Sequence, residues 1–253
     1  MNPLKLLTKF AKIITATQHA LLPSPCECCG ALHTCHQGSV VCADCEALAF
    51  PVAVRCQQCG LRLGIRLQAF GWTRCRHCRF SPNDTRTWVA GDYVAPMDEW
   101  AIALKFRGKE GLAVTFANAL ARTALMEEDF VMPDVLIPMP VSKKRLEERG
   151  YNQALLIARR LGHQLNVACD AHCLIKTRET QKQSGLSAQQ RQHNLGDAFV
   201  VAGNVENLHI GLVDDVMTTG ATLAAARNAL SEHGVVRFSQ WIAFRTPERP
   251  EDD

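Results

Sequence analysis

The sequence predicts an α/β protein with a mostly parallel, doubly wound sheet, preceded by a small cysteine-rich zinc-binding module. From residue 88 onward, apolar stretches of strand length alternate with helical patterns, which is typical of parallel sheets. Four Cys-x-x-Cys pairs lie in the N-terminal third. The 253 residues suffice for one medium-sized domain and a small one. We expect a basic amphipathic helix over 1–25, a double zinc-ribbon-like module over 26–80 and the α/β domain over 88–247.

The order of elements in the α/β domain follows from the apolar periodicity. We expect strands over 88–93, 135–138, 173–176, 208–213 and 235–244, and helices over 96–105, 111–126, 151–165, 187–194 and 222–233. A polar loop is expected after the strand 135–138, and the stretch 178–198 contains few core-forming residues. Strands that alternate with helices in this way predict a parallel sheet covered on both faces.

Composition and charge exclude some classes of protein. The chain is 47% apolar and 21% charged, which is ordinary for a globular protein and argues against intrinsic disorder. Residues 1–90 hold ten Lys and Arg against four Asp and Glu, although the net charge of the chain is only +3. This basic third is compatible with a polyanionic partner, and equally with a small metal-binding module that binds no such partner.

The N-terminal segment carries lysines along one flank of its predicted helix. Lys5, Lys9 and Lys12 interrupt any apolar core of a secretory signal, and no stretch of the chain is apolar enough to span a bilayer. We therefore expect a cytoplasmic protein without a transmembrane segment. The helix would lie at the inner face of the membrane, bind a partner or pack on the protein's own core.

Ten of the twelve cysteines lie between Cys26 and Cys78. Eight of them form the four pairs Cys26/Cys29, Cys42/Cys45, Cys56/Cys59 and Cys75/Cys78. One Cys-x-x-Cys turn supplies two thiolates along an edge of a tetrahedron, and a second turn completes a closed Zn²⁺ site. We therefore expect structural Zn²⁺ bound by these eight thiolates, which would also supply folding energy to a segment too small to bury a sufficient core.

The sequence leaves the ligand pairing open. Successive pairs would make two sites, whereas a cross-braced arrangement would exchange partners between them. Cys28 is an alternative to Cys29, and His33, His36 and His77 are further alternative ligands. An iron–sulfur cluster is a minor alternative to zinc.

A strand that ends in two acids is the most informative feature of the α/β domain. Asp214 and Asp215 follow the apolar run 208–213, and a Thr- and Gly-rich loop leads from them into a helix. Such a loop binds ligands at the carboxyl edge of a parallel sheet, and the helix N-terminus stabilises a phosphate. We expect the phosphate to lie against Met217, Thr218, Thr219, Gly220, Ala221 and Thr222. Carboxylates would repel a bare phosphate, so they indicate a phosphorylated sugar whose hydroxyls donate to them, or Mg²⁺ beside a pyrophosphate.

Two further polar segments supply candidate anion contacts. Arg149 directly precedes the helix 151–165, and the basic residues at 143–145 are either a second contact or a solvated surface. Arg191 is the natural anion contact in the stretch 178–198, whose closure would exclude water from a reactive ligand. Neither a Walker A nor a Rossmann glycine pattern occurs in the chain.

Arginines and aromatic residues are interleaved in the second half of the cysteine-rich segment. The arginines are Arg55, Arg62, Arg66, Arg74, Arg76 and Arg79. With Phe70 and Trp72 they would bind and stack on single-stranded DNA. The alternative is a solvated basic surface in which the two aromatic rings form a small core.

The strand, the acid pair and the Thr-Thr-Gly loop resemble the signature by which type I phosphoribosyltransferases bind 5-phosphoribosyl-1-pyrophosphate (PRPP). Together with the segments 105–108, 149–153 and 178–194, they look like the competence protein F (ComF) family. That family joins an N-terminal zinc finger to a phosphoribosyltransferase-like domain, and the resemblance covers nearly all of the chain from Cys26 onward.

The resemblance implies roles for the site and for the protein. Asp214 and Asp215 would bind the ribose hydroxyls of PRPP, the 217–222 loop would bind its 5′-phosphate, and Mg²⁺ would accompany the ligand. It also implies a role in the uptake or use of external DNA, with proteins of the uptake machinery as partners.

Three functional hypotheses follow. The first is a DNA-handling protein of the competence type that binds PRPP or a related ligand. The second is an active phosphoribosyltransferase that transfers ribose 5-phosphate to a nitrogenous acceptor in nucleotide salvage, although no residue indicates an acceptor pocket. The third is a non-catalytic sensor in which ligand binding changes a protein partnership.

Overall fold

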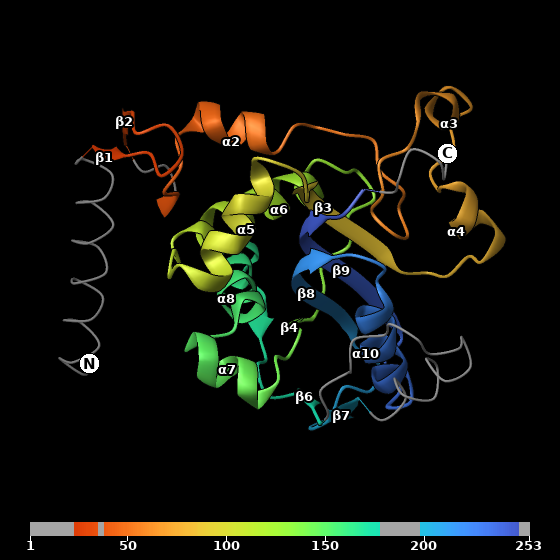
Figure 1. Cartoon of the computed structure of the whole chain (residues 1–253). Coiled ribbons are helices and arrows are strands. Elements are labelled where there is room, and N and C mark those ends of the chain that lie inside the picture. The colour runs from red at the N-terminus through yellow and green to blue at the C-terminus, as the bar shows by residue number, and fades with distance from the viewer. Residues whose placement is uncertain (1–22, 35–37, 178–197, 248–253) are drawn as a thin grey trace, which may run out of the picture.

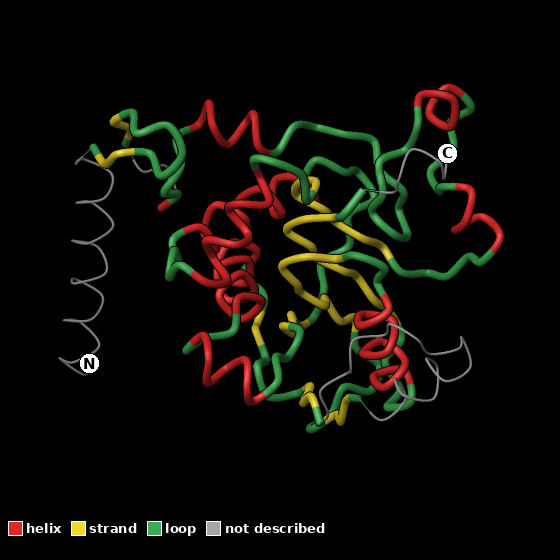
Figure 2. Tube along the Cα trace, viewed as in Figure 1, coloured by secondary structure: helices red, strands yellow, loops and turns green. Residues whose placement is uncertain are grey.

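The computed structural model describes residues 23–34, 38–177 and 198–247 (Figures 1 and 2). Its centre is a five-stranded sheet in which every neighbouring pair of strands is parallel. In spatial order the strands are β3 (Arg86–Asp92), β9 (Arg237–Arg245), β8 (His209–Met217), β4 (Val135–Pro138) and β5 (Ala168–Cys169). The predicted parallel α/β architecture is confirmed, and the strand that carries the two acids lies in the middle of the sheet.

Helices cover both faces of this sheet, as expected for a doubly wound fold. The helices α5 (Met97–Phe106), α6 (Leu112–Leu125) and α8 (Gln153–Leu165) lie on one side, and α10 (Ala221–Ser231) lies on the other (Figure 1). The path from β3 through β4 to β5 crosses the sheet in one direction, whereas the path from β8 to β9 runs in the opposite direction. Since crossovers are right-handed, the two directions place their helices on opposite faces.

Two apolar cores result from this arrangement. Adjacent residues of β9 face opposite ways: Trp241 packs in the core beneath α6 and α8, and Ile242 packs in the core beneath α10. Phe116 of α6 contacts Phe244 of β9 edge to face, with ring centroids 4.9 Å apart. The alternation of sides along a strand explains why the central strands are apolar on both faces.

Some elements differ from the sequence prediction. The predicted polar loop after β4 contains a helix, α7 (Lys143–Arg149), which begins at the cap Ser142 and ends at Gly150 with a left-handed φ of 80°. The predicted strand at 173–176 is present as β6 (Leu174–Lys176), but it pairs antiparallel with β7 (Phe199–Val201) outside the main sheet. The two-residue strand β5 was not predicted, because so short a segment has no periodicity.

The cysteine-rich segment consists of short elements joined by loops (Figure 2). They are β1 (Ser24–Pro25), β2 (Leu32–His33), α2 (Ala43–Ala49), α3 (Ile65–Ala69) and α4 (Arg76–Phe80). Its first part packs on α6, where the hydroxyls of Ser39 and Thr115 are 2.9 Å apart and Arg122 contacts Glu46 at 2.6 Å. Its second part packs along β3, the edge strand of the sheet, where the Thr87 hydroxyl donates to the Gln58 carbonyl at 2.6 Å.

Several predictions fall outside the described residues. These are most of the basic helix over 1–25, the helix over 187–194, Arg191 and His36. Within the described ranges, no helix has both the length and the apolar character needed to cross a membrane.

Candidate functional site

The two acids lie at the carboxyl end of β8, where a parallel sheet binds its ligands. The backbone amide of Asp215 donates to the Asp214 carboxylate at 2.9 Å, and the amide of Val216 donates to the Asp215 carboxylate at 2.8 Å. Asp215 is buried and Asp214 is half-buried. The strand therefore holds both carboxyl groups in place without a ligand.

A lysine from α5 completes this cluster. The Nζ atom of Lys105 lies 2.8 Å from the Oδ2 atom of Asp215. Burial, and secondly the charge of Asp215, raise the pKa of Asp214 to about 8, although Lys105 and the Asp215 amide act in the opposite direction. Two carboxylates so close together favour a proton or a cation between them.

The loop after β8 has the backbone of an anion-binding turn. Gly220 has a left-handed φ of 78° and is the N-cap of α10, where it has no side chain to cap the helix. Thr218, Thr219 and Thr222 are exposed, and the Thr219 hydroxyl accepts from the Ala221 amide at 3.3 Å. Met217 is buried in the core, so its side chain is not available to a ligand. The uncapped N–H groups and exposed hydroxyls can bind a phosphate.

Arg149 and Gln153 lie beyond the carboxyl end of β4, the strand beside β8. The Arg149 guanidinium lies 4.7 Å from the centre of the Phe106 ring, and its Nη1 atom donates to Gln153 at 3.1 Å. The Arg149 Nε and Gln153 Nε2 atoms are buried without a hydrogen-bond partner among the described residues. Two unsatisfied donors at this edge fit an anionic ligand.

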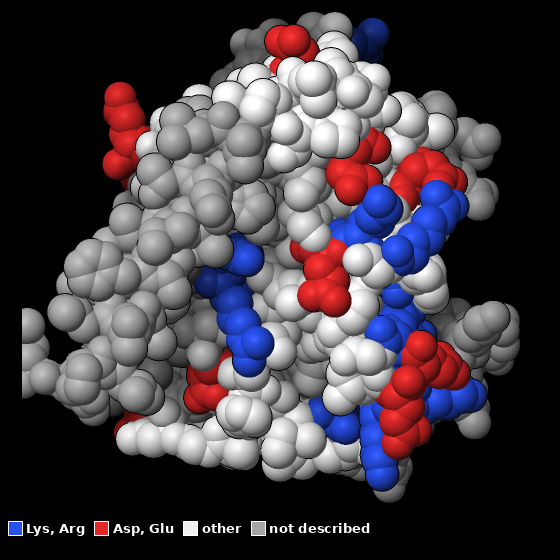
Figure 3. Space-filling view, turned by 90° about the vertical axis from the view of Figure 1, so that its left-hand side faces the viewer, with Lys and Arg blue, Asp and Glu red and all other residues white. Residues whose placement is uncertain are grey.

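The basic residues that precede Arg149 behave differently. Lys143, Lys144 and Arg145 are exposed on α7, and Lys143 lies 3.9 Å from Glu147 on the same helix. Figure 3 shows one face of the molecule, on which basic and acidic side chains are intermingled rather than separated by sign. The solvated-surface interpretation of the residues at 143–145 therefore fits the structure.

An arginine at the end of β9 lies beneath the loop. Arg245 is buried, and its Nη1 atom donates to the carbonyls of Met217 and Thr218, the former at 3.2 Å. Its Nε atom donates to the carbonyl of Cys59 at 3.0 Å. Sequence reasoning missed this residue; the only signal was a charge at the end of an otherwise apolar strand.

The eight predicted cysteines form two separate clusters. The first tetrad is Cys26, Cys29, Cys42 and Cys45, and the second tetrad is Cys56, Cys59, Cys75 and Cys78. In each tetrad all four sulfur atoms lie within 4.8 Å of one another. Successive pairs are therefore partners, and the cross-braced alternative is wrong. Neither Cys28 nor any described histidine belongs to a tetrad.

Backbone amides surround the sulfur atoms. The amides of Cys28 and Cys42 donate to the Cys26 sulfur at 3.4 and 3.3 Å. Burial alone would raise the pKa of Cys26, but the backbone donors at Cys29, Cys42 and Cys28 outweigh burial and lower it to about 6. The pKa of Cys56 is lowered to about 4, mainly by a hydrogen bond with the Cys59 thiol. Each tetrad therefore contains one sulfur that is readily available as a thiolate.

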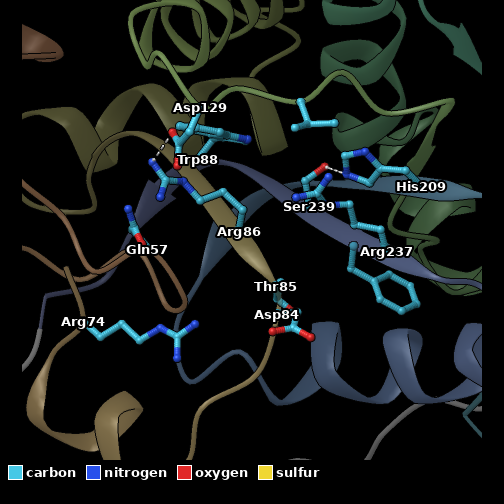
Figure 4. A pocket seen from close by; sticks show the side chains of 12 residues that line it. Gln57, Arg74, Asp84, Thr85, Arg86, Trp88, Asp129, His209, Arg237 and Ser239 are labelled. Carbon is cyan, nitrogen blue, oxygen red and sulfur yellow. Dashed lines mark hydrogen bonds and ion pairs between the residues drawn. The ribbon is translucent and has the colours of Figure 1, made fainter.

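A polar cavity of about 260 Å³ lies at the opposite, amino edge of the sheet (Figure 4). Arg74 of the cysteine-rich segment faces the starts of β3, β8 and β9 there. The charged side chains at this cavity have both signs: Arg86 contacts Asp129 at 3.6 Å, and it also contacts Glu127 at 2.8 Å. The cavity is separate from the acid pair, which lies at the carboxyl edge.

The fold and the site thus define an α/β protein with an acid pair and a glycine-containing loop at the carboxyl edge of its parallel sheet and with two four-cysteine clusters. No family model matches the chain. The DNA utilization protein YhgH of Salmonella typhi is 31% identical over 210 residues, which cover 81% of this chain and 90% of that protein. Competence protein F of Haemophilus influenzae is 30% identical over 223 residues, which cover 85% and 93%. The chain belongs to the family of these two proteins, which confirms the resemblance found in the sequence.

The solved structures that match this chain include a glutamine PRPP amidotransferase and an adenine phosphoribosyltransferase. Glutamine PRPP amidotransferase from B. subtilis has a TM-score of 0.40 and 17% identity, over 56% of this chain and 30% of that one. Adenine phosphoribosyltransferase from Leishmania tarentolae has a TM-score of 0.36 and 10% identity, over 62% and 91%.

Proposed function

We propose that this protein acts in the uptake or use of external DNA and that its α/β domain binds PRPP together with Mg²⁺. The DNA role is supported by the names of its relatives, a DNA utilization protein and a competence protein. The observation that carries the ligand assignment is the Asp214–Asp215 pair at the end of β8, from which a short loop leads to the N-terminus of α10.

Each part of PRPP has a matching group at this edge. Asp214 and Asp215 accept hydrogen bonds from the ribose hydroxyls, and the 217–222 loop binds the 5′-phosphate through backbone amides and threonine hydroxyls. Arg149 binds the pyrophosphate, since its Nε atom is buried without a partner among the described residues. Arg191 is assigned to the same anion from the sequence alone.

The acid pair also offers carboxylate ligands to Mg²⁺. Carboxylate oxygens are the protein ligands that Mg²⁺ prefers, and the ion keeps several waters and phosphate oxygens in its shell. Burial, and secondly the charge of Asp215, raise the pKa of Asp214 even with Lys105 beside the pair, so the doubly ionised pair is unfavourable in the ligand-free protein. A divalent cation that arrives with the pyrophosphate would supply positive charge to the pair.

The two tetrads fit structural Zn²⁺. Four thiolates in a tetrahedron around zinc have sulfur–sulfur distances of about 3.8 Å, given Zn–S bonds of about 2.3 Å. The Cys29 and Cys42 sulfurs are 3.8 Å apart, and the Cys59 and Cys75 sulfurs are 3.7 Å apart. We propose one Zn²⁺ in each tetrad. Thiols that serve as metal ligands must stay reduced, which supports a cytoplasmic location.

A ligand series tests the PRPP assignment. The zinc-loaded protein is titrated calorimetrically with PRPP, ribose 5-phosphate and pyrophosphate, each with Mg²⁺. Because the site matches both halves of PRPP, we expect PRPP to bind more tightly than either fragment. Equal affinity for pyrophosphate alone would contradict the ribose and 5′-phosphate assignments.

A second function, binding of single-stranded DNA, is favoured by an exposed aromatic group on the cysteine-rich segment. Phe70 and Trp72 stack with ring centroids 5.5 Å apart, and the Arg79 guanidinium lies 3.4 Å from the centre of the Trp72 ring. Phe70 is 73% exposed, so these rings do not form the small core that was the alternative. Aromatic rings flanked by arginine are the stacking platform of proteins that bind single strands.

Not all of the predicted arginines are available for DNA. Arg55 contacts Asp92 at the end of β3 at 2.7 Å, and Arg62 contacts the other oxygen of the same carboxylate. The expectation that these two arginines bind DNA is corrected, because they hold the cysteine-rich segment to the sheet. Arg66, Arg76 and Arg79 are exposed and remain candidates.

A further inference from the structure

Arg245 connects two parts of the molecule that bind different ligands in the proposed function. One guanidinium donates to the Cys59 carbonyl in the second tetrad at 3.0 Å, and to the carbonyls of Met217 and Thr218 in the proposed phosphate loop. It also donates to the Thr246 carbonyl at 2.6 Å. A planar guanidinium with donors in a fixed fork fixes these carbonyls relative to one another.

The contact orients the loop as well as anchoring it. A peptide bond is planar and trans, so the N–H that follows a carbonyl points away from it. Because the carbonyls of Met217 and Thr218 are directed at Arg245, the N–H groups of Thr218 and Thr219 are directed to the other side of the loop. Those are amides that a 5′-phosphate at this turn would require.

The other end of the contact depends on the second tetrad. The 56–60 turn is closed by the Gly60 amide, which donates to the Cys56 carbonyl at 2.9 Å. The Arg55 guanidinium donates to the Gly60 carbonyl at 3.1 Å and holds the turn to the end of β3 through Asp92. Cys56 and Cys59 supply two of the four sulfurs of the tetrad, so a bound metal fixes the turn that presents the Cys59 carbonyl.

We propose that Arg245 is a positioning residue that couples metal occupancy of the second tetrad to the phosphate loop. Zinc in that tetrad then raises the affinity of the loop for the phosphate of PRPP, and PRPP raises the affinity of the tetrad for zinc by the same factor. This inference rests on the proposed PRPP and zinc sites. The first tetrad provides the comparison, because its segment packs on α6. The hydrogen bonds that Arg245 donates among the described residues go to Cys59, Met217, Thr218 and Thr246, and none goes to the first tetrad.

The test is a thermodynamic cycle on the full zinc-loaded protein. PRPP with Mg²⁺ is titrated into wild type, Arg245→Met, Cys75→Ala and the double variant, with zinc content measured for each. We expect each single variant to weaken PRPP binding about tenfold, and the double variant to be no weaker than Arg245→Met. Cys29→Ala, which removes one ligand of the first tetrad, measures the general cost of losing a metal ion. If the losses of PRPP affinity in Arg245→Met and Cys75→Ala multiply in the double variant, the two residues act independently and the proposal is overturned. A loss of PRPP affinity in Cys29→Ala equal to that in Cys75→Ala would also overturn it.

Two further measurements separate this proposal from its premises. Arg245→Lys keeps the positive charge but not the fork, so we expect it to recover only part of the affinity lost in Arg245→Met. The second measurement is amide hydrogen exchange at Thr218 and Thr219 in the absence of PRPP. We expect these amides to exchange faster in Arg245→Met and in Cys75→Ala than in wild type. If wild type fails to bind PRPP, the proposed function fails, but the exchange experiment still decides the coupling. Unchanged exchange in Cys75→Ala at reduced zinc content would refute the coupling.

Discussion

The Nζ atom of Lys105 at the end of α5 lies 2.8 Å from the Oδ2 atom of Asp215 at the end of β8. Both side chains are largely buried, so the pair is shielded from water. It also brings the 105–108 segment, whose sequence resembled the family, against the acid pair. Lys105 thus partners Asp215, whereas the pKa of Asp214 stays raised despite the nearby ammonium.

Replacement of Lys105 by methionine should destabilise the protein. The change leaves Asp215 buried without its partner beside Asp214, which costs on the order of 3 kcal/mol. Urea unfolding at neutral pH measures the effect. Lys109→Met is the control, because Lys109 and Glu27 form an exposed pair at 2.8 Å that contributes at most about 1 kcal/mol. Equal losses from the two variants would show that the Lys105 pair is only a surface contact.

Stability should depend on pH through Asp214. Folding raises its pKa from 3.8 to about 8, so the folded state holds this proton more tightly than the unfolded state does. The contribution of Asp214 to stability is therefore fully present below about pH 4 and is lost as the pH rises through about 8. Asp214→Asn mimics the protonated side chain and should exceed wild type in stability by an amount that grows as the pH rises from about 4 to about 8 and stays constant above about 8. Unfolding curves at both pH values check this, and a constant difference would contradict the raised pKa.

Two glycines test the docking of the second tetrad on β3. Gly60 has a φ of +72°, and a Cβ there would lie 2.4 Å from the Cγ2 atom of Val89. Gly30 has a φ of +73°, but a Cβ there would meet nothing within 4 Å. Both alanine variants incur about 1 kcal/mol of backbone strain, and only Gly60→Ala adds a clash of about 1–3 kcal/mol. Thermal unfolding should show a larger loss for Gly60→Ala, whereas matching losses would mean that the turn is not held against the strand.

The exposed aromatic pair should contribute to binding of single-stranded DNA. Trp72→Ala removes a stacking surface worth about 1–3 kcal/mol, so we expect about tenfold weaker binding of a fluorescent oligothymidine in anisotropy titrations. Phe80→Ala is the matched control, because Phe80 is 82% exposed in the same segment but lies outside the stacked Phe70–Trp72 pair. If both variants bind DNA like wild type at unchanged zinc content, the platform is not the DNA site.

The sequence predicted those parts of the structure that depend on local pattern. β4 occupies the predicted residues 135–138, and the central strands and their helices follow the expected order. The eight cysteines could be chosen from their spacing alone, because a Cys-x-x-Cys turn is a local structure. Asp214 and Asp215 were placed at the sheet edge because they directly follow an apolar run.

Contacts between distant segments could not be predicted in this way. Arg55 looked like a surface charge, and its partner Asp92 lies on a strand of the other part of the chain. Arg245 gained its role only because β9 lies between β3 and β8, which brings Cys59 and Thr218 to its two sides. The helix α7 was missed because its residues face solvent and show no apolar stripe, although Ser142 and Gly150 are ordinary helix caps.

The assignment of the acid pair is best tested by calorimetric titration of the zinc-loaded protein with PRPP and Mg²⁺, alongside the Asp214→Asn/Asp215→Asn double variant. We expect saturable binding by wild type and its loss in the variant, with unchanged zinc content, because the asparagines lack the charge that binds the ribose hydroxyls and Mg²⁺. No binding by wild type, or equal binding by the variant, would contradict the assignment of the acid pair as a PRPP site.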